Sequence, residues 1–219
     1  MNIIQPSVTI IDGPTEEQLY QRIEEAGRTC YRSEDKKEEG SAEKVLMDLL
    51  RRGHLAMIEH AVITARFVCD RGVTHEIVRH RIASYAQEST RYCNYSKGKY
   101  GSQISVIDLA TGFSYDLSNE TDRLKYEEWQ EAMNDAERHY MNMIKLGASA
   151  QEARSVLPNS TKTEIVITMN AREWRHFFNL RALGTTGAPH PQMQQVATMA
   201  FELFKENWPL LFEDLDYAN

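Results

Sequence analysis

Residues 61–69 read AVITARFVC, a run in which valine, isoleucine and threonine favour an extended backbone. A second run of the same kind, TEIVITM, occupies residues 163–169. Both runs predict strands, and around them strands and helices are mixed without a steady strand–helix–strand alternation. This pattern favours an α+β fold, with a mainly antiparallel sheet flanked by helices, over a doubly wound parallel sheet.

The rest of the chain predicts two further short strands and several helices with one apolar face. The expected strands are residues 8–11, 61–69, 103–107 and 163–169, and the expected helices are residues 15–26, 41–53, 73–80, 120–146, 171–183 and 192–211. We expect Ser118 to cap the long helix and Pro209 to interrupt the last one. The apolar side of the long helix is expected to hold Leu124, Trp129, Met133, Ala136, Tyr140 and Met143.

The composition is that of an ordinary soluble protein, expected to form one domain over residues 1–219. A chain of 219 residues can bury a core without a disulfide or a metal. Its net charge of −7 argues against a protein that coats nucleic acid, although a local basic pocket remains possible. No segment reaches the roughly 18 consecutive apolar residues of a membrane span, and no signal peptide is recognisable. Three cysteines without a CxxC pair are expected to be free thiols, which indicates a cytoplasmic protein with no membrane partner.

Residues 79–92 read RHRIASYAQESTRY and concentrate positive charge in an acidic chain. Arginine forks pair with phosphate or carboxylate through two hydrogen bonds, and hydroxyl and amide groups complete such a site. The stretch therefore predicts an anion-binding site, with a solvated basic turn as the alternative. Three cationic or titratable side chains directly after Ile77 and Val78 favour the binding site.

A second stretch, NAREWRHFFNLR at residues 170–181, predicts a helix with two different faces. The polar stripe holds Arg172, His176 and Asn179, and the apolar stripe holds Trp174, Phe177, Phe178 and, one turn further on, Arg181. An arginine on a core-facing stripe is unfavourable unless it is paired or binds a ligand, so Arg181 is a candidate functional residue. The alternative is that Arg181 extends to solvent at the helix end or pairs there with an acid.

Three other chemistries lack the sequence features that they need. His75 and His80 resemble a zinc-protease pair, but five positions place them about 140° apart on a helix, so we expect no metal site. Neither Ser84 nor Ser89 lies in a GxSxG turn, and the sequence contains no glycine-rich phosphate loop. The competing class is a non-catalytic protein that binds nucleotides or single-stranded nucleic acid. Its stacking residues would be Tyr85, Tyr92, Tyr95 and Tyr100.

These residues occur in an order that resembles one enzyme family. Residues 79–81, followed by seven positions and Ser89, resemble the RHR-x7-S signature of the flavin-dependent thymidylate synthases. Residues 53–60 resemble the family's upstream GHxSxxEH block, residues 154–158 its ARxLP segment, and residues 170–181 its NxR and LR block. The resemblance covers residues 28–181 and implies an α+β fold with active sites at subunit interfaces.

The resemblance also implies a reaction, the reductive methylation of deoxyuridine monophosphate (dUMP) to thymidylate (dTMP). The carbon donor would be 5,10-methylenetetrahydrofolate, and FAD reduced by NADPH would supply the hydride, with release of tetrahydrofolate. No cysteine nucleophile is implied. The family further implies a homotetramer, with dUMP rather than nucleic acid as the partner.

The family's functional positions carry over to this sequence as two sets. The residues implied to bind dUMP are Glu76, Arg79, Gln87, Glu88, Ser89, Thr90, Arg91, Arg154 and Arg181. The residues implied to bind FAD are Cys30, Ala56, Glu59, Arg79, His80, Arg81, Gln87, Asn170, Arg172 and His176. Arg181 is the implied catalytic residue, because a cation at the pyrimidine favours ionisation at N3 and moves electron density toward C5.

Several positions depart from the family's common pattern. Ala56 stands where serine or threonine is usual, Cys30 where serine is frequent, and Glu76 where glutamine is frequent. Ala86 and Gln87 replace the more frequent Asn-Glu pair. Because these residues neighbour the motifs and leave the arginines in place, we expect retained activity with altered affinity for the ligands.

Overall fold

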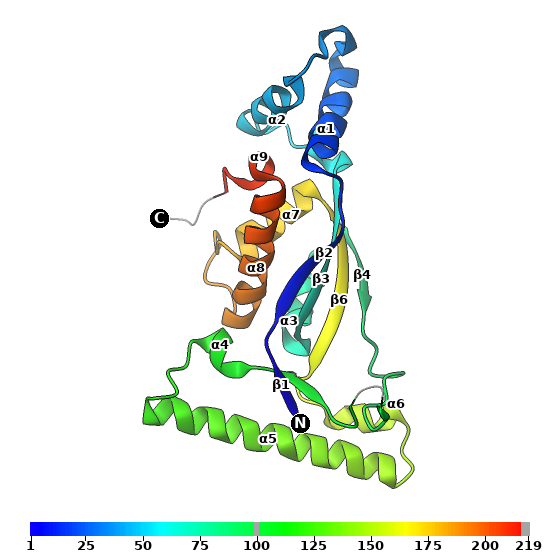
Figure 1. The fold of residues 1–219 in the computed structure, drawn as a ribbon, viewed down its shortest axis with the longest axis vertical. Coiled ribbons are helices and arrows are strands. Elements are labelled where there is room, and N and C mark those ends of the chain that lie inside the picture. The colour runs from blue at the N-terminus through cyan, green and yellow to red at the C-terminus, as the bar shows by residue number, and fades with distance from the viewer. Residues whose placement is uncertain (99–100, 216–219) are drawn as a thin grey trace. The chain divides into compact units, whose positions relative to one another are not determined.

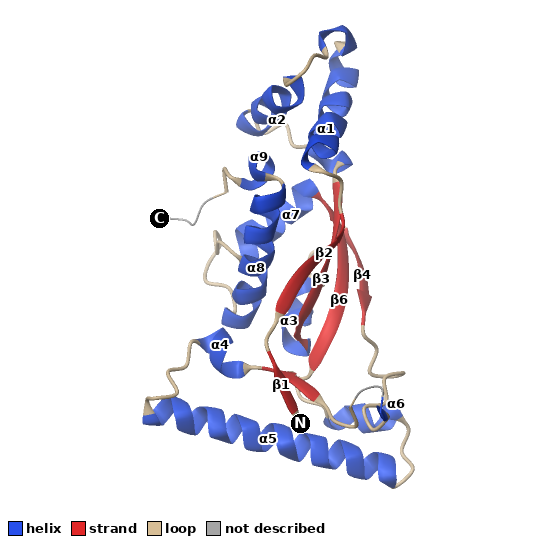
Figure 2. Cartoon of the chain, in the orientation of Figure 1, coloured by secondary structure: helices blue, strands red, loops and turns tan. Residues whose placement is uncertain are grey.

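Strands and helices alternate irregularly along the chain (Figure 2). The computed structural model describes residues 1–98 and 101–215, so Tyr100 of the expected stacking set lies outside the described residues. The strands are β1 (Asn2–Ile4), β2 (Ser7–Asp12), β3 (Val62–Asp70), β4 (Ala83–Gln87), β5 (Ser105–Ile107) and β6 (Lys162–Asn170). The helices are α1 (Glu16–Tyr31), α2 (Ser41–Arg51), α3 (Arg71–Ile77), α4 (Leu109–Phe113), α5 (Glu120–Lys145), α6 (Ala150–Ala153), α7 (Ala171–Arg181), α8 (Pro191–Asn207) and α9 (Pro209–Phe212). Short 3-10 turns are η1 (Glu34–Lys36), η2 (Met57–His60) and η4 (Arg154–Val156).

The two runs that predict strands, β3 and β6, are neighbours in the larger sheet. That sheet has the order β2-β3-β6-β4, and β1 pairs with β5 in a separate parallel pair. At one end of the β3–β6 pair, Ala171 N donates to Ala61 O at 2.8 Å, and at the other end Arg71 N donates to Thr161 O at 3.1 Å. The two strands therefore run antiparallel, and the predicted α+β class is confirmed.

Alternate residues of these two strands are buried, and this period of two is what makes the runs strands. The buried side chains include Ile63, Ala65, Phe67 and Cys69 in β3, and Thr163, Ile165, Ile167 and Met169 in β6. On the other face of the pair, the hydroxyls of Thr64 and Thr168 share a hydrogen bond of 2.9 Å. Each strand thus presents one buried face and one more polar face.

The chain divides into two compact units, each built from several segments. Unit 1 contains residues 1–7, 67–79 and 86–165, and unit 2 contains residues 8–66, 80–85 and those from 166 onward. The boundary falls inside strands β2, β3, β4 and β6 instead of in a linker. The expectation of a single domain over residues 1–219 stays a prediction.

The core of unit 1 packs against α5, the long helix drawn in green beside α6 (Figure 1). Met133 and Tyr140 of α5 are buried together with residues of the β5 region, and Trp129 and Met143 pack against them. Leu124, expected on the same side, is 48% exposed. The prediction for Leu124 is therefore wrong, because the first turns of α5 do not contribute to this cluster.

Asn119 caps α5, so the expectation of Ser118 as the cap is also wrong. Asn119 Oδ1 accepts from Thr121 N at 3.0 Å and from Asp122 N at 3.2 Å. The Ser118 hydroxyl instead donates to Asp116 Oδ1 at 2.6 Å. Asparagine directly before the helix reaches its first free N–H groups, and the serine closes the preceding turn.

The core of unit 2 is an aromatic cluster carried by α7, α8 and α9, which lie side by side (Figure 1). Trp174, Phe177 and Phe178 of α7 are fully buried, so the predicted apolar stripe is confirmed. The ring of Phe178 lies 5.2 Å from that of Phe201 and 5.5 Å from that of Phe212. The predicted break at Pro209 is confirmed as the boundary between α8 and α9.

The arginine-rich stretch differs most from its prediction. Helix α3 ends at Ile77, so Arg79 and His80 lie outside the helix expected over residues 73–80. The strand β4 follows within the same stretch and was missed by the sequence argument. Because β4 is an edge strand of its sheet, it does not need the apolar alternation that identifies an inner strand. Helix α1 also continues past residue 26, which places Cys30 in its last turn.

All three cysteines are free thiols, as predicted. Cys30 is exposed, Cys93 is half-buried and Cys69 is buried in β3, where burial raises the pKa of its thiol. Across the described residues, no helix has the length and apolar character needed to cross a bilayer.

Candidate active site

Helix α7 supplies most of the polar groups that gather in unit 2. Asn170 caps this helix, and its Oδ1 accepts from the N–H of the third helical residue at 2.9 Å. On the apolar face, Trp174 Nε1 donates to Ile63 O at 3.1 Å and ties the helix to β3. This contact fixes the rotation of α7, and Arg172 and His176 are exposed, in agreement with the predicted polar stripe.

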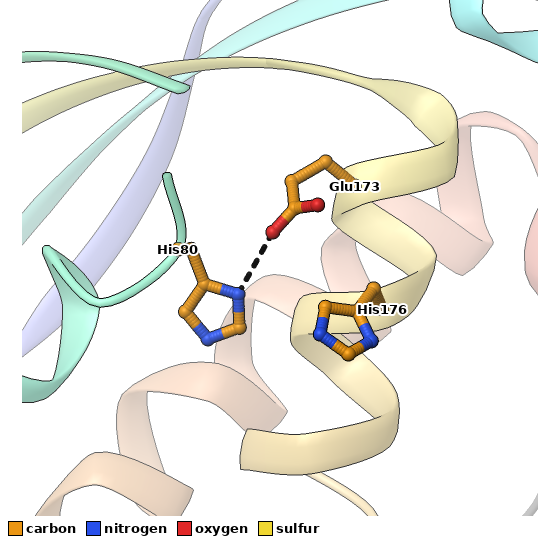
Figure 3. A group of neighbouring side chains, drawn as sticks. All are labelled: His80, Glu173 and His176. Carbon is orange, nitrogen blue, oxygen red and sulfur yellow. Dashed lines mark hydrogen bonds and ion pairs between the residues drawn. The ribbon is translucent and has the colours of Figure 1, made fainter. Parts of the chain in front are cut away.

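Glu173, His80 and Arg181 form a hydrogen-bonded chain that begins and ends on α7. His80 Nδ1 lies 3.0 Å from Glu173 Oε1 (Figure 3). On the opposite side of the imidazole, Arg181 Nε donates to His80 Nε2 at 3.4 Å. Phe177 packs edge-on against the same ring, with the ring centroids 5.0 Å apart. The structure thus brings together two predicted site residues, His80 and Arg181, and adds Glu173.

The imidazole of His80 is buried and its titration is perturbed. Burial lowers its pKa below the ordinary value of 6.5, and the positive charge of Arg181 and the nearby His176 add to that effect. The hydrogen bond and charge of Glu173 oppose the shift without cancelling it. The ring is therefore neutral at neutral pH, and it carries a single N–H group.

A cavity of about 530 Å³ opens beside α7 in unit 2. Glu59, Asn170, Arg172 and His176 line it, and the family resemblance implies a contact with FAD for each of the four. Glu59 and Arg172 form an ion pair of 2.6 Å across this lining. Residues from two distant parts of the sequence therefore meet at one concave surface.

The donor groups of this cavity fit a flavin. An amide, a guanidinium and an imidazole can meet the carbonyl oxygens and ring nitrogens of a planar heteroaromatic ring, or phosphate oxygens. Three other residues implied for FAD, Cys30, Ala56 and Arg81, are exposed and lie outside the lining of this cavity. Ala56 has no side-chain donor, so this chain lacks the hydroxyl that is usual at its position.

In unit 1, Gln87 at the end of β4 is held in one orientation by two threonines. Its Nε2 donates to Thr74 Oγ1 at 3.2 Å and to Thr163 Oγ1 at 3.3 Å. The Thr74 hydroxyl donates its own proton to Arg71 O at 2.7 Å, so its oxygen must act as the acceptor for the amide. The amide nitrogen of Gln87 is therefore engaged by the two threonines, and its implied contacts with dUMP and FAD stay predictions.

Glu88 is engaged in a network with other side chains of unit 1. Its Oε1 accepts from Tyr95 OH at 3.2 Å, and its Oε2 accepts from Lys162 Nζ at 3.0 Å. Burial alone lowers the pKa of Lys162, but its bonds to Glu164 and Glu88 outweigh burial and raise that pKa. Glu88 thus anchors the start of the loop that follows β4, and its implied contact with dUMP stays a prediction.

The loop after β4 carries three more of the residues implied to bind the nucleotide, Ser89, Thr90 and Arg91. Ser89 Oγ accepts from Arg91 N at 3.3 Å, and Arg91 Nε donates to Gln151 Oε1 at 3.1 Å. Arg79, Arg91 and Arg154 are exposed, whereas Thr90 is buried. The guanidinium groups of Arg79, Arg91 and Arg154 are thus accessible to solvent, and a guanidinium is the type of group that recognises phosphate.

The two implied sets separate between the two units. The residues implied for dUMP, apart from Arg181, belong to unit 1: Glu76, Arg79, Gln87, Glu88, Ser89, Thr90, Arg91 and Arg154. The residues implied for FAD, apart from Arg79 and Gln87, belong to unit 2: Cys30, Ala56, Glu59, His80, Arg81, Asn170, Arg172 and His176. Each unit thus carries most of one set.

Sequence reasoning missed Glu173, Thr74 and Lys162. Glu173 precedes Phe177 by four positions and so lies on the apolar stripe of the helix, where an acid is unfavourable without a partner. The position of this acid on the apolar stripe therefore indicates, from sequence alone, that it has a partner. Thr74 and Lys162 lie outside every motif and act on residues distant in sequence, so no local pattern identifies them.

His80, Glu173 and His176 also have the spacing of a metal site, with donor atoms within 4.8 Å of one another. Both ring nitrogens of His80 are already hydrogen-bonded, and Arg181 places a positive charge beside the ring. A bound cation would break these bonds and meet electrostatic repulsion. We interpret the group as a hydrogen-bonded chain, and the absence of a metal site stays a prediction.

A larger cavity of about 710 Å³ is lined by α1 and α2 in unit 2. Arg28 and His54, which belong to the family blocks, lie along it, but the residues implied for FAD and dUMP do not. Arg28 is held there by Glu24 at 2.9 Å. The cavity beside α7 is therefore the better candidate for the active site.

The fold and the site define a class of protein, an α+β protein with a cavity whose donor groups fit a flavin and with exposed guanidinium groups of the type that binds anions. Residues 15–210 match the family described as thymidylate synthase complementing protein. The chain belongs to this family, so the resemblance stated from the motifs is confirmed.

Named relatives agree with this assignment, and a solved structure shares the fold. A flavin-dependent thymidylate synthase of Corynebacterium aurimucosum is 34% identical over 198 residues, covering 88% of this chain and 78% of that protein. Its counterpart in Pyrococcus furiosus is 38% identical over 144 residues, so the match spans 65% of this chain and 55% of the relative. The UMP/dUMP methylase PolB of Streptomyces cacaoi, solved with 5-Br dUMP, has the same fold, with a TM-score of 0.79, 22% identity and coverage of 97% and 96% of the two chains.

Proposed function

We propose that this chain is a flavin-dependent thymidylate synthase that converts dUMP to dTMP. The one-carbon unit of 5,10-methylenetetrahydrofolate is transferred to C5 of the pyrimidine, and tetrahydrofolate is released. One NADPH is oxidised to NADP⁺ and one proton is taken up, so atoms and electrons balance. FAD supplies the hydride chemistry when it is bound, and the chain's own residues bind, orient and polarise the reactants.

One observation carries this proposal: four residues that the family motifs assign to FAD line a single cavity. Arg172 and His176 come from α7 and Asn170 caps that helix, whereas Glu59 comes from η2, more than a hundred positions earlier in the sequence. Motif matches alone do not require such residues to meet. Their convergence supports a flavin site at this place.

The residues of unit 1 are assigned to the nucleotide. Arg91 and Arg154 are suited to the phosphate, because an exposed guanidinium can pair with it through two hydrogen bonds. Ser89 orients the substrate, and Gln87 offers an amide oxygen whose direction is fixed by Thr74. These groups position dUMP without forming a covalent bond to it.

Arg181 is assigned to the pyrimidine ring. A guanidinium there stabilises the negative charge that develops when N3 loses its proton, and this charge increases the electron density at C5. His80 Nε2 accepts from Arg181 Nε at 3.4 Å, so the guanidinium has a defined partner in the ligand-free protein. Arg181 is in this proposal the catalytic residue.

The proposed working form is a cytoplasmic homotetramer in which neighbouring subunits complete each site. Ile82, in the lining of the cavity beside α7, is 67% exposed. An exposed isoleucine at the edge of this cavity is compatible with such an assembly.

A second candidate is a non-catalytic protein that binds single-stranded nucleic acid. Tyr92 is 77% exposed, and the guanidinium of Arg91 lies 5.5 Å from the centre of its ring. Such a pair can stack on a base. The net charge of −7 opposes this candidate, because a polyanion would be repelled by most of the surface.

A titration with FAD tests the proposed function. The wild-type protein is expected to bind FAD, turn yellow and oxidise NADPH under anaerobic conditions in a reaction whose rate depends on dUMP. Asn170→Ser keeps a side-chain oxygen to cap α7 but removes the amide from the cavity, so we expect weaker FAD binding with unchanged thermal unfolding. A colourless protein that binds oligonucleotides and no flavin would support the second candidate.

A further inference from the structure

The side chain of Glu173 meets His80, its backbone N–H donates to the Asn170 cap at 2.9 Å, and the residue also lines the cavity beside α7. Its carboxylate lies 3.0 Å from His80 Nδ1, and the residue is 8% exposed (Figure 3). No family motif in this sequence includes it as a functional position. A buried acid placed on the apolar stripe of a helix needs a reason, because its transfer from water is unfavourable unless it is hydrogen-bonded.

Arg181 determines where the proton of His80 must be. A guanidinium has only donors, so Arg181 Nε–H can meet His80 Nε2 only when Nε2 carries no proton. In a neutral ring the remaining proton is then on Nδ1, which points to Glu173 (Figure 3). The three residues form one directed chain, from Arg181 through the imidazole to the carboxylate.

Loss of the carboxylate would reverse this arrangement. Nδ1–H would be buried without its acceptor, and the ring could move its proton to Nε2. An Nε2–H group would face the N–H of Arg181, and two donors at 3.4 Å oppose each other. The guanidinium would then lose its hydrogen bond to the imidazole of His80.

We propose that Glu173 is a positioning residue that holds the Nδ1–H tautomer of His80 and thereby fixes the guanidinium of Arg181. The part of this inference that concerns catalysis rests on the proposed function, while the part that concerns the tautomer does not. The other groups around the imidazole do not replace Glu173. His176 lies 5.6 Å away between ring centroids, and Tyr85 OH donates to the backbone oxygen of His80, not to the ring.

The first test is the protonation of His80 in the full-length protein without ligands. Nitrogen-15 NMR of histidine-labelled protein is expected to show a protonated Nδ1 and an unprotonated Nε2 for the His80 ring, identified by comparison with His80→Gln. In Glu173→Ala we expect the Nε2–H tautomer to appear. A wild-type ring protonated on Nε2, or a tautomer unchanged in Glu173→Ala, would overturn the proposal.

The second test separates positioning from a merely structural role. Glu173→Gln keeps an oxygen that can accept from Nδ1–H, so it is expected to retain the tautomer and most of the turnover. Glu173→Ala is expected to lower kcat by about 100-fold with a much smaller change in the KM for dUMP. Asp214→Asn is the matched control, because Asp214 binds α7 through Arg175 at 2.6 Å and does not contact His80.

The two tests keep the failure of this inference distinct from the failure of the proposed function. If the wild-type protein forms no dTMP, the proposed function fails, and the NMR result still decides the role of Glu173. If Glu173→Ala does not fold, the test consists of the tautomer measured in the wild type and in Glu173→Gln. Equal losses of kcat in Glu173→Gln, Glu173→Ala and Asp214→Asn, with an unchanged tautomer, would contradict positioning.

Discussion

The guanidinium of Arg181 lies at the end of the helix face that carries Trp174 and Phe177, and its planar set of donors suits a planar anionic ring. Lysine at this position would keep the positive charge but lose the planar set of donors. We expect Arg181→Lys to lower kcat by about 100- to 1,000-fold while FAD binding stays close to wild type. Steady-state kinetics and a flavin titration measure the two effects.

A control for this substitution is Arg138→Lys, on an exposed ion pair with Asp135 in α5. We expect its kinetics to equal those of the wild type, because an exposed pair contributes little. If Arg181→Lys keeps the turnover of the wild type, the assignment of the guanidinium to the pyrimidine ring is contradicted.

His80 makes the stability of the fold depend on pH in a defined direction. Its pKa in the folded chain is lowered from 6.5, chiefly by burial, so the unfolded chain binds a proton more readily. The contribution of neutral His80 to the free energy of unfolding is therefore fully present above pH 6.5. This contribution is lost as the pH decreases from 6.5 toward the lowered pKa. Urea unfolding should show this loss in the wild type, and the loss should be smaller in His80→Gln. Equal slopes in the two proteins below pH 6.5 would contradict the assignment.

At the scale of the element, α7 is held by its aromatic face. The ring of Phe178 lies 5.7 Å from Trp174 and 5.2 Å from Phe204, and its side chain is fully buried. We expect Phe178→Ala to lower the free energy of unfolding by about 3–5 kcal/mol, because the transfer and cavity terms add. Leu124→Ala is the control: Leu124 is 48% exposed, so a change within about 0.5 kcal/mol is expected. Denaturant unfolding measures both.

The same scale shows what local pattern can and cannot predict. The runs of β3 and β6 and the two stripes of α7 are visible in the sequence because burial imposes a period on neighbouring residues. Strand β4 has no such period, since it lies at the edge of its sheet. The predicted cap of α5, Ser118, and the observed cap, Asn119, differ by a single position. Serine and asparagine are both good helix caps, so the sequence alone does not separate them.

The residues of the site also divide into those that a local sequence pattern identifies and those that it does not. Residues within motifs, such as His80 and Arg181, could be identified from their order along the chain. Glu173 could have been inferred from its place on an apolar stripe. Thr74 and Lys162 could not, because each acts through a contact formed only in the folded chain, with Gln87 and Glu88 respectively.

At the scale of the whole molecule, the two compact units are assigned mainly to different ligands. Unit 2 carries most of the residues assigned to FAD, and unit 1 carries most of those assigned to dUMP. The acidic net charge of −7 is compatible with this division, because the stretch from Arg79 to Arg91 concentrates positive charge locally. This charge distribution therefore favours a small anionic substrate over a polyanion.

Transfer of the labelled one-carbon unit tests this account most directly. The reconstituted protein is supplied with FAD, NADPH, dUMP and 5,10-methylenetetrahydrofolate labelled with carbon-13 in its methylene group. We expect the label in the C5 methyl group of dTMP, one labelled carbon for each NADPH oxidised, and tetrahydrofolate as the folate product. NADPH oxidation without labelled dTMP, or dihydrofolate as the product, would contradict the account.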